Sequence, residues 1–235
     1  MHIFLAMLLP IVGIAGLWHG FSRMRRYRMI MDIPTSRIRS LAMGLVEIVG
    51  RAVPDTLIHT RWSRIECVYF RYEVKEYRRH RSGKHTRHSW DTIDSGENRI
   101  PFFVDDDTGS VRVDPDGAEY NLDVGKVFLQ RALGSEMEEI DTDRIFGFYT
   151  VGDRKHYEYF ILPGEEVYVL GTAAIDKTAP GEIAVEQGEN ERMFLISDHS
   201  EKELLSSFRW QMIGGFAFGV VLIAVWVGML VGGRF

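Results

Sequence analysis

The chain has a long apolar run near each end, with a mixed polar and apolar segment between them. The second run, residues 212–231, has 20 residues and no charged side chain. At a rise of ~1.5 Å per residue, a helix of this length crosses a hydrocarbon layer of about 30 Å. The first run, residues 3–21, is apolar except for His19 and contains Pro10. We therefore expect a transmembrane helix near each end.

The first run is near the lower length limit for a span, so a secretory signal peptide is the alternative. A signal peptide has basic residues before its apolar run and a small-residue cleavage site after it. Here no A-x-A-like site follows the run. Four arginines follow it instead, namely Arg23, Arg25, Arg26 and Arg28. This pattern favours a retained anchor.

The basic residues next to the two runs predict the orientation, because Lys and Arg are enriched on the cytoplasmic side of a membrane. The four arginines lie on the domain side of the first run. Lys202 and Arg209 lie on the domain side of the second run, against Arg234 on its other side. We therefore expect a multi-pass protein of the cell membrane with its central domain in the cytoplasm.

Between the two runs, the sequence alternates as half-buried strands do. In residues 67–77, Val68, Phe70, Tyr72 and Val74 share one face, while charged residues and Tyr69 share the other. Further short strands are expected at 44–49, 101–104, 111–114, 127–130, 157–162, 167–170 and 193–196, with turns at 106–109 and 163–165. Many short strands separated by turns predict a small sandwich or a partly open barrel. The expected fold class is α+β, with two transmembrane helices flanking one mainly-β domain.

The boundaries of these parts follow from changes in composition. Residues 22–36 are expected to form a basic juxtamembrane linker and residues 37–198 the soluble β-rich domain, which begins with a short helix at 37–42. Residues 136–140 are compatible with a helical turn. Asp198 and Glu201 have the spacing of a capping box for a helix over 199–211 that continues into the span.

Small residues recur at intervals of four in both runs, at Gly16 and Gly20, Gly215 and Gly219, and Gly228 and Gly232. This spacing permits close approach of two helices. Pairing of the two spans with each other, or with a span of another protein, is therefore compatible with the sequence.

Residues 75–87 form a strongly basic segment. It has Lys75, Arg78, Arg79, Arg81, Lys84 and Arg87 against Glu76 alone, which gives a net charge of +5. If the segment lies near a membrane, each basic residue contributes about 1 kcal/mol of attraction to anionic headgroups. The alternative is a solvated hairpin tip centred on residues 82–83. A nucleic-acid partner is not expected, because no folded recognition motif accompanies the segment.

The candidate membrane-surface residues are therefore two basic groups, Arg23, Arg25, Arg26 and Arg28 next to the first span and Arg78, Arg79, Arg81, Lys84 and Arg87 in the central domain. Anionic lipid is the partner that these residues imply.

Other candidate chemistry is weaker. His80, His85 and His88 match no common zinc spacing, and basic residues lie between them. The aspartates at 105–107 lack the ligand spacing of an EF-hand loop. Cys67 is the single cysteine, which excludes an intrachain disulfide, and it is expected to be buried and structural. Residues 197–199, Ser-Asp-His, are expected to form a helix cap. We expect no cofactor, no metal site and no catalytic residue.

Several segments match a known family in their order and spacing. They are 44–50 (GLVEIVG), 67–69 (CVY) with Trp90 downstream, 101–104 (PFFV), 111–115 (VRVDP), 163–171 (PGEEVYVLG) and 194–197 (FLIS). From about residue 33 to 209, the chain resembles the GIDE domain, also called the beside-a-membrane domain. This domain occurs in the mitochondrial and chloroplast outer-membrane ubiquitin ligases.

The resemblance implies two spans around the domain and a connection to ubiquitin ligases. The family ligases carry a RING module after the second span, and a RING needs about eight Cys and His ligands to hold two zinc ions. With one cysteine and four residues after residue 231, this sequence is expected to have no RING and to be a prokaryotic relative. The domain of the ligases faces the intermembrane space, which differs from the cytoplasmic placement expected above.

Two functions remain open. The chain is expected to be a non-catalytic binding or scaffolding module at the membrane, with the lipid bilayer and a protein as partners. The alternative is a component of a ubiquitin-like ligase system whose RING is supplied by another protein. An enzyme with its own active site has no acid–base pair or activated nucleophile in the sequence to support it.

Overall fold

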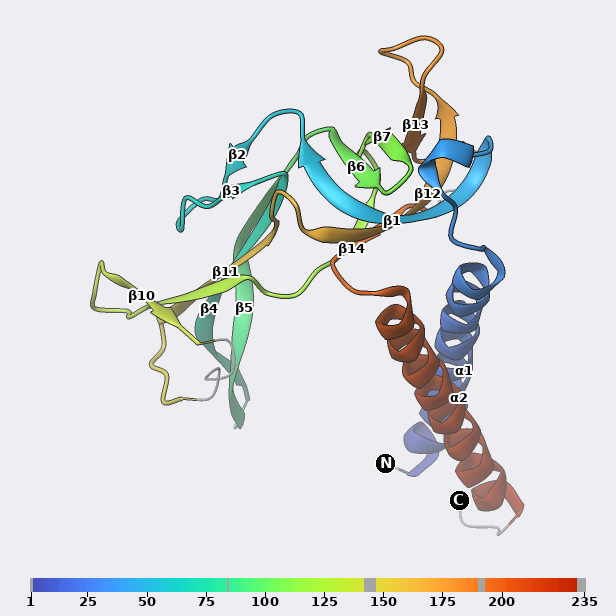
Figure 1. Cartoon of the computed structure of the whole chain (residues 1–235). Coiled ribbons are helices and arrows are strands. Elements are labelled where there is room, and N and C mark those ends of the chain that lie inside the picture. The colour runs from blue at the N-terminus through green and yellow to red at the C-terminus, as the bar shows by residue number, and fades with distance from the viewer. Residues whose placement is uncertain (1, 84, 142–146, 190–192, 232–235) are drawn as a thin grey trace. The chain divides into compact units, whose positions relative to one another are not determined.

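The computed structural model describes the chain except residues 1, 84, 142–146, 190–192 and 232–235, and except the side chains of residues 2–7, 29 and 82. The chain divides into two compact units. One unit, Met1–Pro34 with His199–Phe235, consists of two helices, and the other, Thr35–Asp198, consists mainly of strands (Figure 1).

The helices α1 (His2–Asp32) and α2 (Glu201–Val231) pack closely against each other through glycines. A Cβ atom at Gly16 would lie 3.3 Å from the backbone of Gly219, and a Cβ atom at Gly219 would lie 2.8 Å from the carbonyl oxygen of Gly13. Any larger residue at these positions would push the helices apart. The close approach predicted from the glycine spacing is therefore confirmed for this pair of helices.

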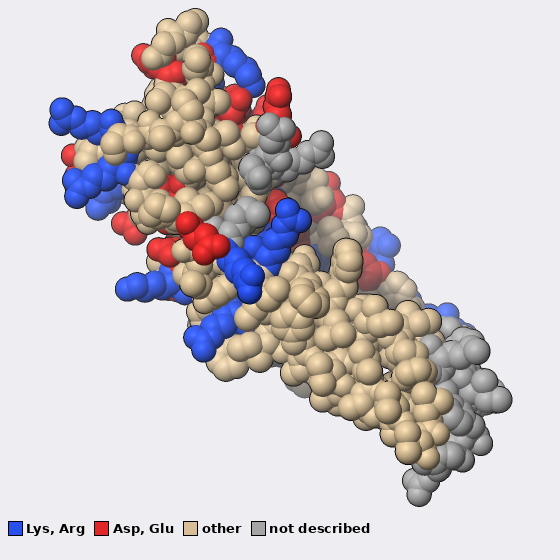
Figure 2. Space-filling model, turned by 90° about the vertical axis from the view of Figure 1, so that its right-hand side faces the viewer, with Lys and Arg blue, Asp and Glu red and all other residues tan. Residues whose placement is uncertain are grey.

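Within the described residues, α2 is the one helix that is long and apolar enough, by length and composition, to cross a membrane. It includes the predicted span 212–231 and is continuous from Glu201, as expected. In the view of Figure 2, a broad area without charged side chains covers the helical unit. The first predicted span, 3–21, lies inside α1, whose side chains before Leu8 are outside the described residues, and α1 does not meet the same measure.

Two predicted details of the helices need correction. The expected linker at 22–36 is helical as far as Asp32, because arginine and methionine favour helix. The capping box of α2 is formed by Ser200 and Glu203 instead of Asp198 and Glu201. The backbone N–H and the hydroxyl of Ser200 donate to Glu203 Oε2 at 3.0 and 2.9 Å. Asp198 accepts from the amide of Asp123, so the sequence contains two candidate boxes and the later one is used.

The larger sheet of the β unit closes on itself. Its ring consists of five strands, β1 (Gly44–Pro54), β6 (Phe102–Asp106), β7 (Gly109–Val113), β13 (Ile183–Glu186) and β12 (Glu166–Ile175), in that order. The pairing of β1 with both β6 and β12 closes the ring, and β7 and β13 run parallel. The strands β14 (Leu195–Ser197) and β8 (Glu119–Asn121) extend the sheet from β12.

Closure depends on the point where β1 passes from one neighbour to the other. Arg51 is paired both with Glu166 of β12 and with Asp105 of β6. A Cβ atom at the preceding residue, Gly50, would overlap the carbonyl oxygen of Asp105. A glycine therefore lets the two strands approach here. Inside the ring, the core is apolar, and residues such as Phe102 are fully buried.

The smaller sheet is open and antiparallel. Its strand order is β10-β9-β11-β4-β5. The strands are β10 (Met137–Ile140), β9 (Lys126–Gln130), β11 (Arg154–Ile161), β4 (Tyr69–Ser82) and β5 (His85–Arg99). A short pair, β2 (Ile58–His59) and β3 (Glu66–Cys67), completes the strands.

The predicted fold class is confirmed in its coarser form, an α+β chain with a mainly-β domain that contains a partly closed five-stranded barrel. All eight predicted strands are present, with shifted ends. The short helix expected at 37–42 is a single 3-10 turn, η1 (Ile38–Ser40). The helical turn considered at 136–140 is wrong, because these residues form β10 and pair with β9.

Candidate functional site

One face of the five-stranded sheet is defined by a row of residues that crosses all of its strands. The row runs from Glu138 through Leu129, Lys155 and Lys75 to Thr92. Residues directly opposite each other in neighbouring strands point to the same face of a sheet. We call the face to which this row points the pocket face.

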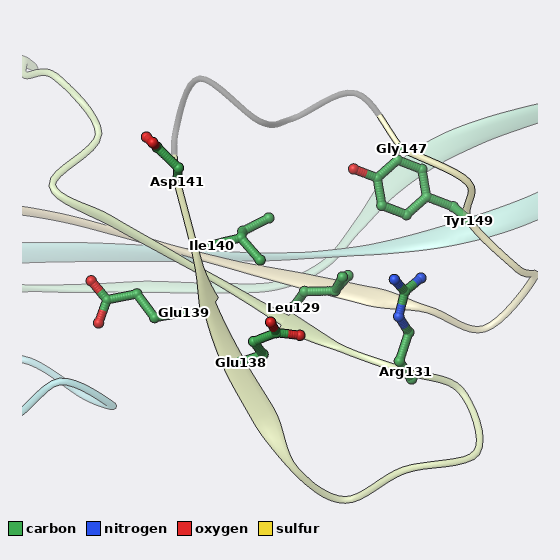
Figure 3. A pocket seen from close by; sticks show the side chains of 8 residues that line it. All are labelled: Leu129, Arg131, Glu138, Glu139, Ile140, Asp141, Gly147 and Tyr149. Atoms are coloured by element: carbon green, nitrogen blue, oxygen red, sulfur yellow. The ribbon is translucent and has the colours of Figure 1, made fainter.

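A pocket of about 560 Å³ lies at the β10 end of this face. Its lining residues come from β9, β10 and the segment before β11; they are Leu129, Arg131, Glu138, Glu139, Ile140, Asp141, Gly147 and Tyr149 (Figure 3). Figure 3 shows the guanidinium of Arg131 reaching toward the ring of Tyr149, with the carboxylate of Glu138 across from them. Glu139 points away and accepts from Lys126 Nζ at 2.8 Å. The pocket therefore has an acidic side at Glu138 and a basic side at Arg131.

A buried carboxylate, Asp153, holds the two segments beside this pocket. It accepts hydrogen bonds from the amides of Ala132 at 2.9 Å and Thr150 at 3.0 Å, and from Arg131 Nη1 at 3.0 Å. Burial alone would raise the pKa of Asp153, but these donors outweigh it and hold the pKa below its ordinary value. Arg131 also donates to the carbonyl oxygen of Phe148. The pocket rim is thus fixed by a charged group that stays ionised.

A buried lysine lies next to the pocket among aromatic rings. Lys155 is 1 % exposed, and its Nζ lies 4.3 Å from the ring centroid of Tyr149 and 4.7 Å from that of Trp90. Tyr77 packs against both rings, at 5.1 Å from Trp90 and 6.0 Å from Tyr149. The faces of aromatic rings attract a cation, which offsets part of the cost of burying an ammonium group. We call Tyr77, Trp90 and Tyr149 the aromatic cluster.

Cation–aromatic pairs continue along the pocket face away from the pocket. Lys75 lies over Tyr157 at 5.0 Å, and Arg71 lies over Tyr159 at 4.3 Å. Glu73 lies between these cations, 3.3 Å from Lys75 and 3.8 Å from Arg71. All five side chains are only partly buried. The pocket face therefore presents tyrosines and fixed charges to its surroundings.

The opposite face is covered by the segment 60–65, which a second buried carboxylate holds. Glu158 accepts from the amide of Trp62 at 2.7 Å and from the hydroxyl of Ser63 at 2.5 Å. Trp62 packs edge-on against His156 at 4.8 Å. Burial, together with the nearby charges of Arg154 and Arg61, lowers the pKa of His156.

Among the described residues, Cys67 does not have the exposed, electropositive surroundings of a reactive cysteine. Its thiol is buried, and desolvation with the nearby Glu158 charge raises its pKa to about 12. A thiol in this state stays protonated at neutral pH and is inert. The expectation of a buried structural cysteine is confirmed.

The predicted membrane-surface residues fall into two groups in the structure. Arg78, Arg79, Arg81 and Arg87 are exposed at the tip of the β4–β5 hairpin, while Lys84 lies outside the described residues. Arg23, Arg25, Arg26 and Arg28 all belong to α1. The first group is thus brought together, and the second lies in the other unit. The hairpin tip expected around residues 82–83 is confirmed, with Gly83 at a φ of 58°.

The histidines of the hairpin have other contacts. His80 Nε2 lies 2.7 Å from Asp91 Oδ2, and the His88 ring stacks on Tyr77 at 5.6 Å. The two imidazoles point to opposite faces of the hairpin. His80 is paired with Arg87 and His88 with Arg79, and neighbouring pairs along a hairpin point to alternate faces.

Sequence reasoning missed the pocket, Asp153 and the buried Lys155. A signal for part of the site was present. Lys155, Tyr157 and Tyr159 alternate along one strand, as do Arg71 and Lys75 along another, and two such strands with complementary patterns suggest cross-strand pairs. The role of Asp153 was visible only in part, because Thr150 is three residues away but the donors Arg131 and Ala132 are more than 20 residues away.

Comparison with known proteins yields one match. A family model described as "GIDE: E3 Ubiquitin ligase" matches residues 72–228, which is more than half of the chain. The match starts within β4 and extends through most of α2. The predicted resemblance is confirmed, although the segments 44–50 and 67–69 lie outside the matched range. No curated protein and no solved structure is significantly similar to the chain.

Proposed function

The chain belongs to the GIDE family, and on this premise we propose that it is a membrane-anchored, non-catalytic binding module whose pocket face holds a protein partner. One observation carries the proposal, the open pocket beside partly exposed tyrosines that lie under Arg71 and Lys75. Tyrosine, tryptophan and arginine are the residue types that contribute most to binding at protein interfaces. A polar pocket bordered by such residues can orient and hold a partner's side chain.

The anchor in this proposal consists of both helices. α2 supplies a span by its length and composition, and α1 packs on it through Gly13, Gly16 and Gly20. Glycine contacts of this kind are typical of helices that associate inside a bilayer. The arginines of α1 favour a cytoplasmic position for its C-terminal end. These two features support a multi-pass protein of the cell membrane with a cytoplasmic β unit.

A second candidate function is supported by the family description, which refers to E3 ubiquitin ligases. In this alternative, the chain supplies the location and the partner, and another protein supplies the zinc-binding RING. A RING protein, a conjugating enzyme or a ubiquitin-like protein encoded by a neighbouring open reading frame would favour this alternative.

The test is affinity purification of the full chain from native membranes, with two charge-reversal variants compared by quantitative mass spectrometry. Glu138→Lys reverses the charge of one exposed acid of the pocket, and Glu182→Lys makes the same change on the exposed end of the barrel. Reversing a charge at an interface opposes the complementary charge of the partner. We expect Glu138→Lys to reduce recovery of the partner by about tenfold or more, with Glu182→Lys unchanged.

Equal recovery of the same proteins by both variants would contradict a role for the pocket face. A RING protein or conjugating enzyme among the proteins that Glu138→Lys loses would support the ligase alternative. Loss of proteins with no such connection would support the simpler binding module.

A further inference from the structure

The β4–β5 hairpin extends beyond the rest of its sheet. Pairing of β4 with β11 ends at Glu76 and Arg154, whereas pairing of β4 with β5 continues to Ser82 and His85. Residues 77–82 and 85–90 therefore form a two-stranded ribbon beyond the sheet, about 20 Å long at 3.3 Å per residue. Figure 1 shows this hairpin running past the ends of the neighbouring strands.

All charged residues of the ribbon are basic. The sequence from residue 77 to 90 contains no Asp or Glu. Arg78 pairs with Glu76 at 2.8 Å. Within the part of the chain that the structure describes, Arg79, Arg81 and Arg87 are exposed and have no ion-pair partner. Like charges on an exposed two-stranded ribbon repel one another, so the ribbon is suited to meet a surface of opposite charge.

The base of the ribbon is held firmly. Tyr77 exchanges backbone hydrogen bonds with the segment before β11, donating to the carbonyl oxygen of Asp153 at 2.8 Å and accepting from the amide of Gly152 at 2.9 Å. The Tyr77 ring stacks on His88 and packs on Trp90. The arginines therefore belong to a hairpin whose base is held by hydrogen bonds and ring contacts, which lowers the entropy cost of binding.

We propose that this ribbon contacts the phosphate groups of anionic lipids in the membrane that holds the chain. Each basic residue near an anionic leaflet adds electrostatic attraction, whether it is an arginine or a lysine. The anchor helix keeps the ribbon at a high effective concentration near the bilayer, so a modest affinity is sufficient. This contact goes beyond the proposed partner binding, because it uses residues outside the pocket.

The experiment uses the full chain in nanodiscs with and without phosphatidylglycerol. A fluorophore is attached through Thr86→Cys, an exposed ribbon position paired with Arg81. The single native thiol, Cys67, is buried with a raised pKa and stays unlabelled. Quenching by headgroup-labelled lipid then reports how often the ribbon lies at the bilayer.

We expect strong quenching in anionic discs and weak quenching in purely zwitterionic ones. The variant Arg79→Gln, Arg81→Gln, Arg87→Gln should lower the ratio of bound to free ribbon by about fivefold per arginine. The matched control, with lysine at the same three positions, keeps the charge and should keep most of the contact. Exposed positions of this kind tolerate substitution with little loss of stability, and circular dichroism verifies the fold.

Quenching that is independent of lipid charge, or unchanged by the glutamine variant, would overturn the proposal. So would a lysine variant that loses contact as completely as the glutamine variant, because that result indicates a partner that recognises guanidinium geometry and not a charged bilayer. Partner recovery through the pocket face is measured separately, so the two proposals can fail independently.

Discussion

The two sheets of the β unit differ in whether their edge strands are paired. The barrel joins β1 to β12 and so pairs both edges of its ring, around a core of apolar residues. The five-stranded sheet leaves β10 and β5 as its outer strands and buries polar groups such as Asp153, Lys155 and Glu158. Both halves of the domain combine apolar packing with buried charges, but the open sheet concentrates three of them, Asp153, Lys155 and Glu158, within residues 153–158. The barrel buries Glu47 of β1, which accepts from Tyr168 and Thr35. The candidate surfaces all lie on the open sheet.

The largest expected effect is on the barrel. Replacing the fully buried Phe102 with alanine removes a ring from the centre of the core. Such truncations cost about 3–5 kcal/mol of unfolding free energy because a cavity remains. Urea unfolding of the full chain in detergent micelles, followed by tryptophan fluorescence, measures the change. A loss below about 1 kcal/mol would mean that the barrel does not depend on its apolar core.

A smaller effect, with a pH dependence, is expected on the open sheet. Asp153→Asn removes the charge that binds Arg131 and two amides, and we expect a loss of about 1–3 kcal/mol at pH 7. Because the folded pKa of Asp153 is below its ordinary value, its contribution is complete above pH ~4 and disappears as the pH falls through the folded pKa.

The difference in stability between wild type and Asp153→Asn should therefore shrink as the pH falls below about 4. Melting temperatures of both proteins across this range provide the measurement. A difference that stays constant down to pH 2 would show that the carboxylate charge is not what stabilises the pocket rim.

The smallest effect is expected at the edge of the pocket. Phe148 is fully exposed, with only its backbone carbonyl bonded to Arg131. Phe148→Ser should change the unfolding free energy by less than about 0.5 kcal/mol, because no buried contact is lost. It is the matched control for Phe102→Ala, since both remove a phenyl ring. A large loss at Phe148 would mean that this ring packs against part of the protein in solution.

The sequence was informative where apolar and polar residues alternate along a strand. Residues 67–77 alternate in this way, and the structure places β4 there from Tyr69 onward, with no exposed residue between 69 and 77. The strand β5 had no such pattern, because residues 85–99 are polar except for Trp90, Ile93 and Gly96, and they form an outer strand. The segment at 136–140 contains two adjacent glutamates, which favour helix locally, but pairing with β9 overrides that preference.

The site could be predicted only in part for the same reason. The hairpin arginines are contiguous in the sequence, so their charge is visible before the fold is known. The pocket combines residues from three segments, and Asp153 unites two of them through backbone amides. Such contacts depend on register, which a single sequence does not contain.

The closed barrel has a consequence for the time course of synthesis. β1 cannot pair with β12 until β12 has been synthesised, because Arg51 pairs with Glu166 and Gly44 with Ala173. At ~5–20 residues per second on the ribosome, this wait is roughly ten seconds. The β4–β5 hairpin is complete long before then and can form first. The last strand of the ring ends at Glu186, shortly before α2 starts at Glu201. The barrel therefore closes just as the anchor helix begins to be made. Until then β1 can pair only with β6, through residues 51–54, and its pairing with β12 comes last.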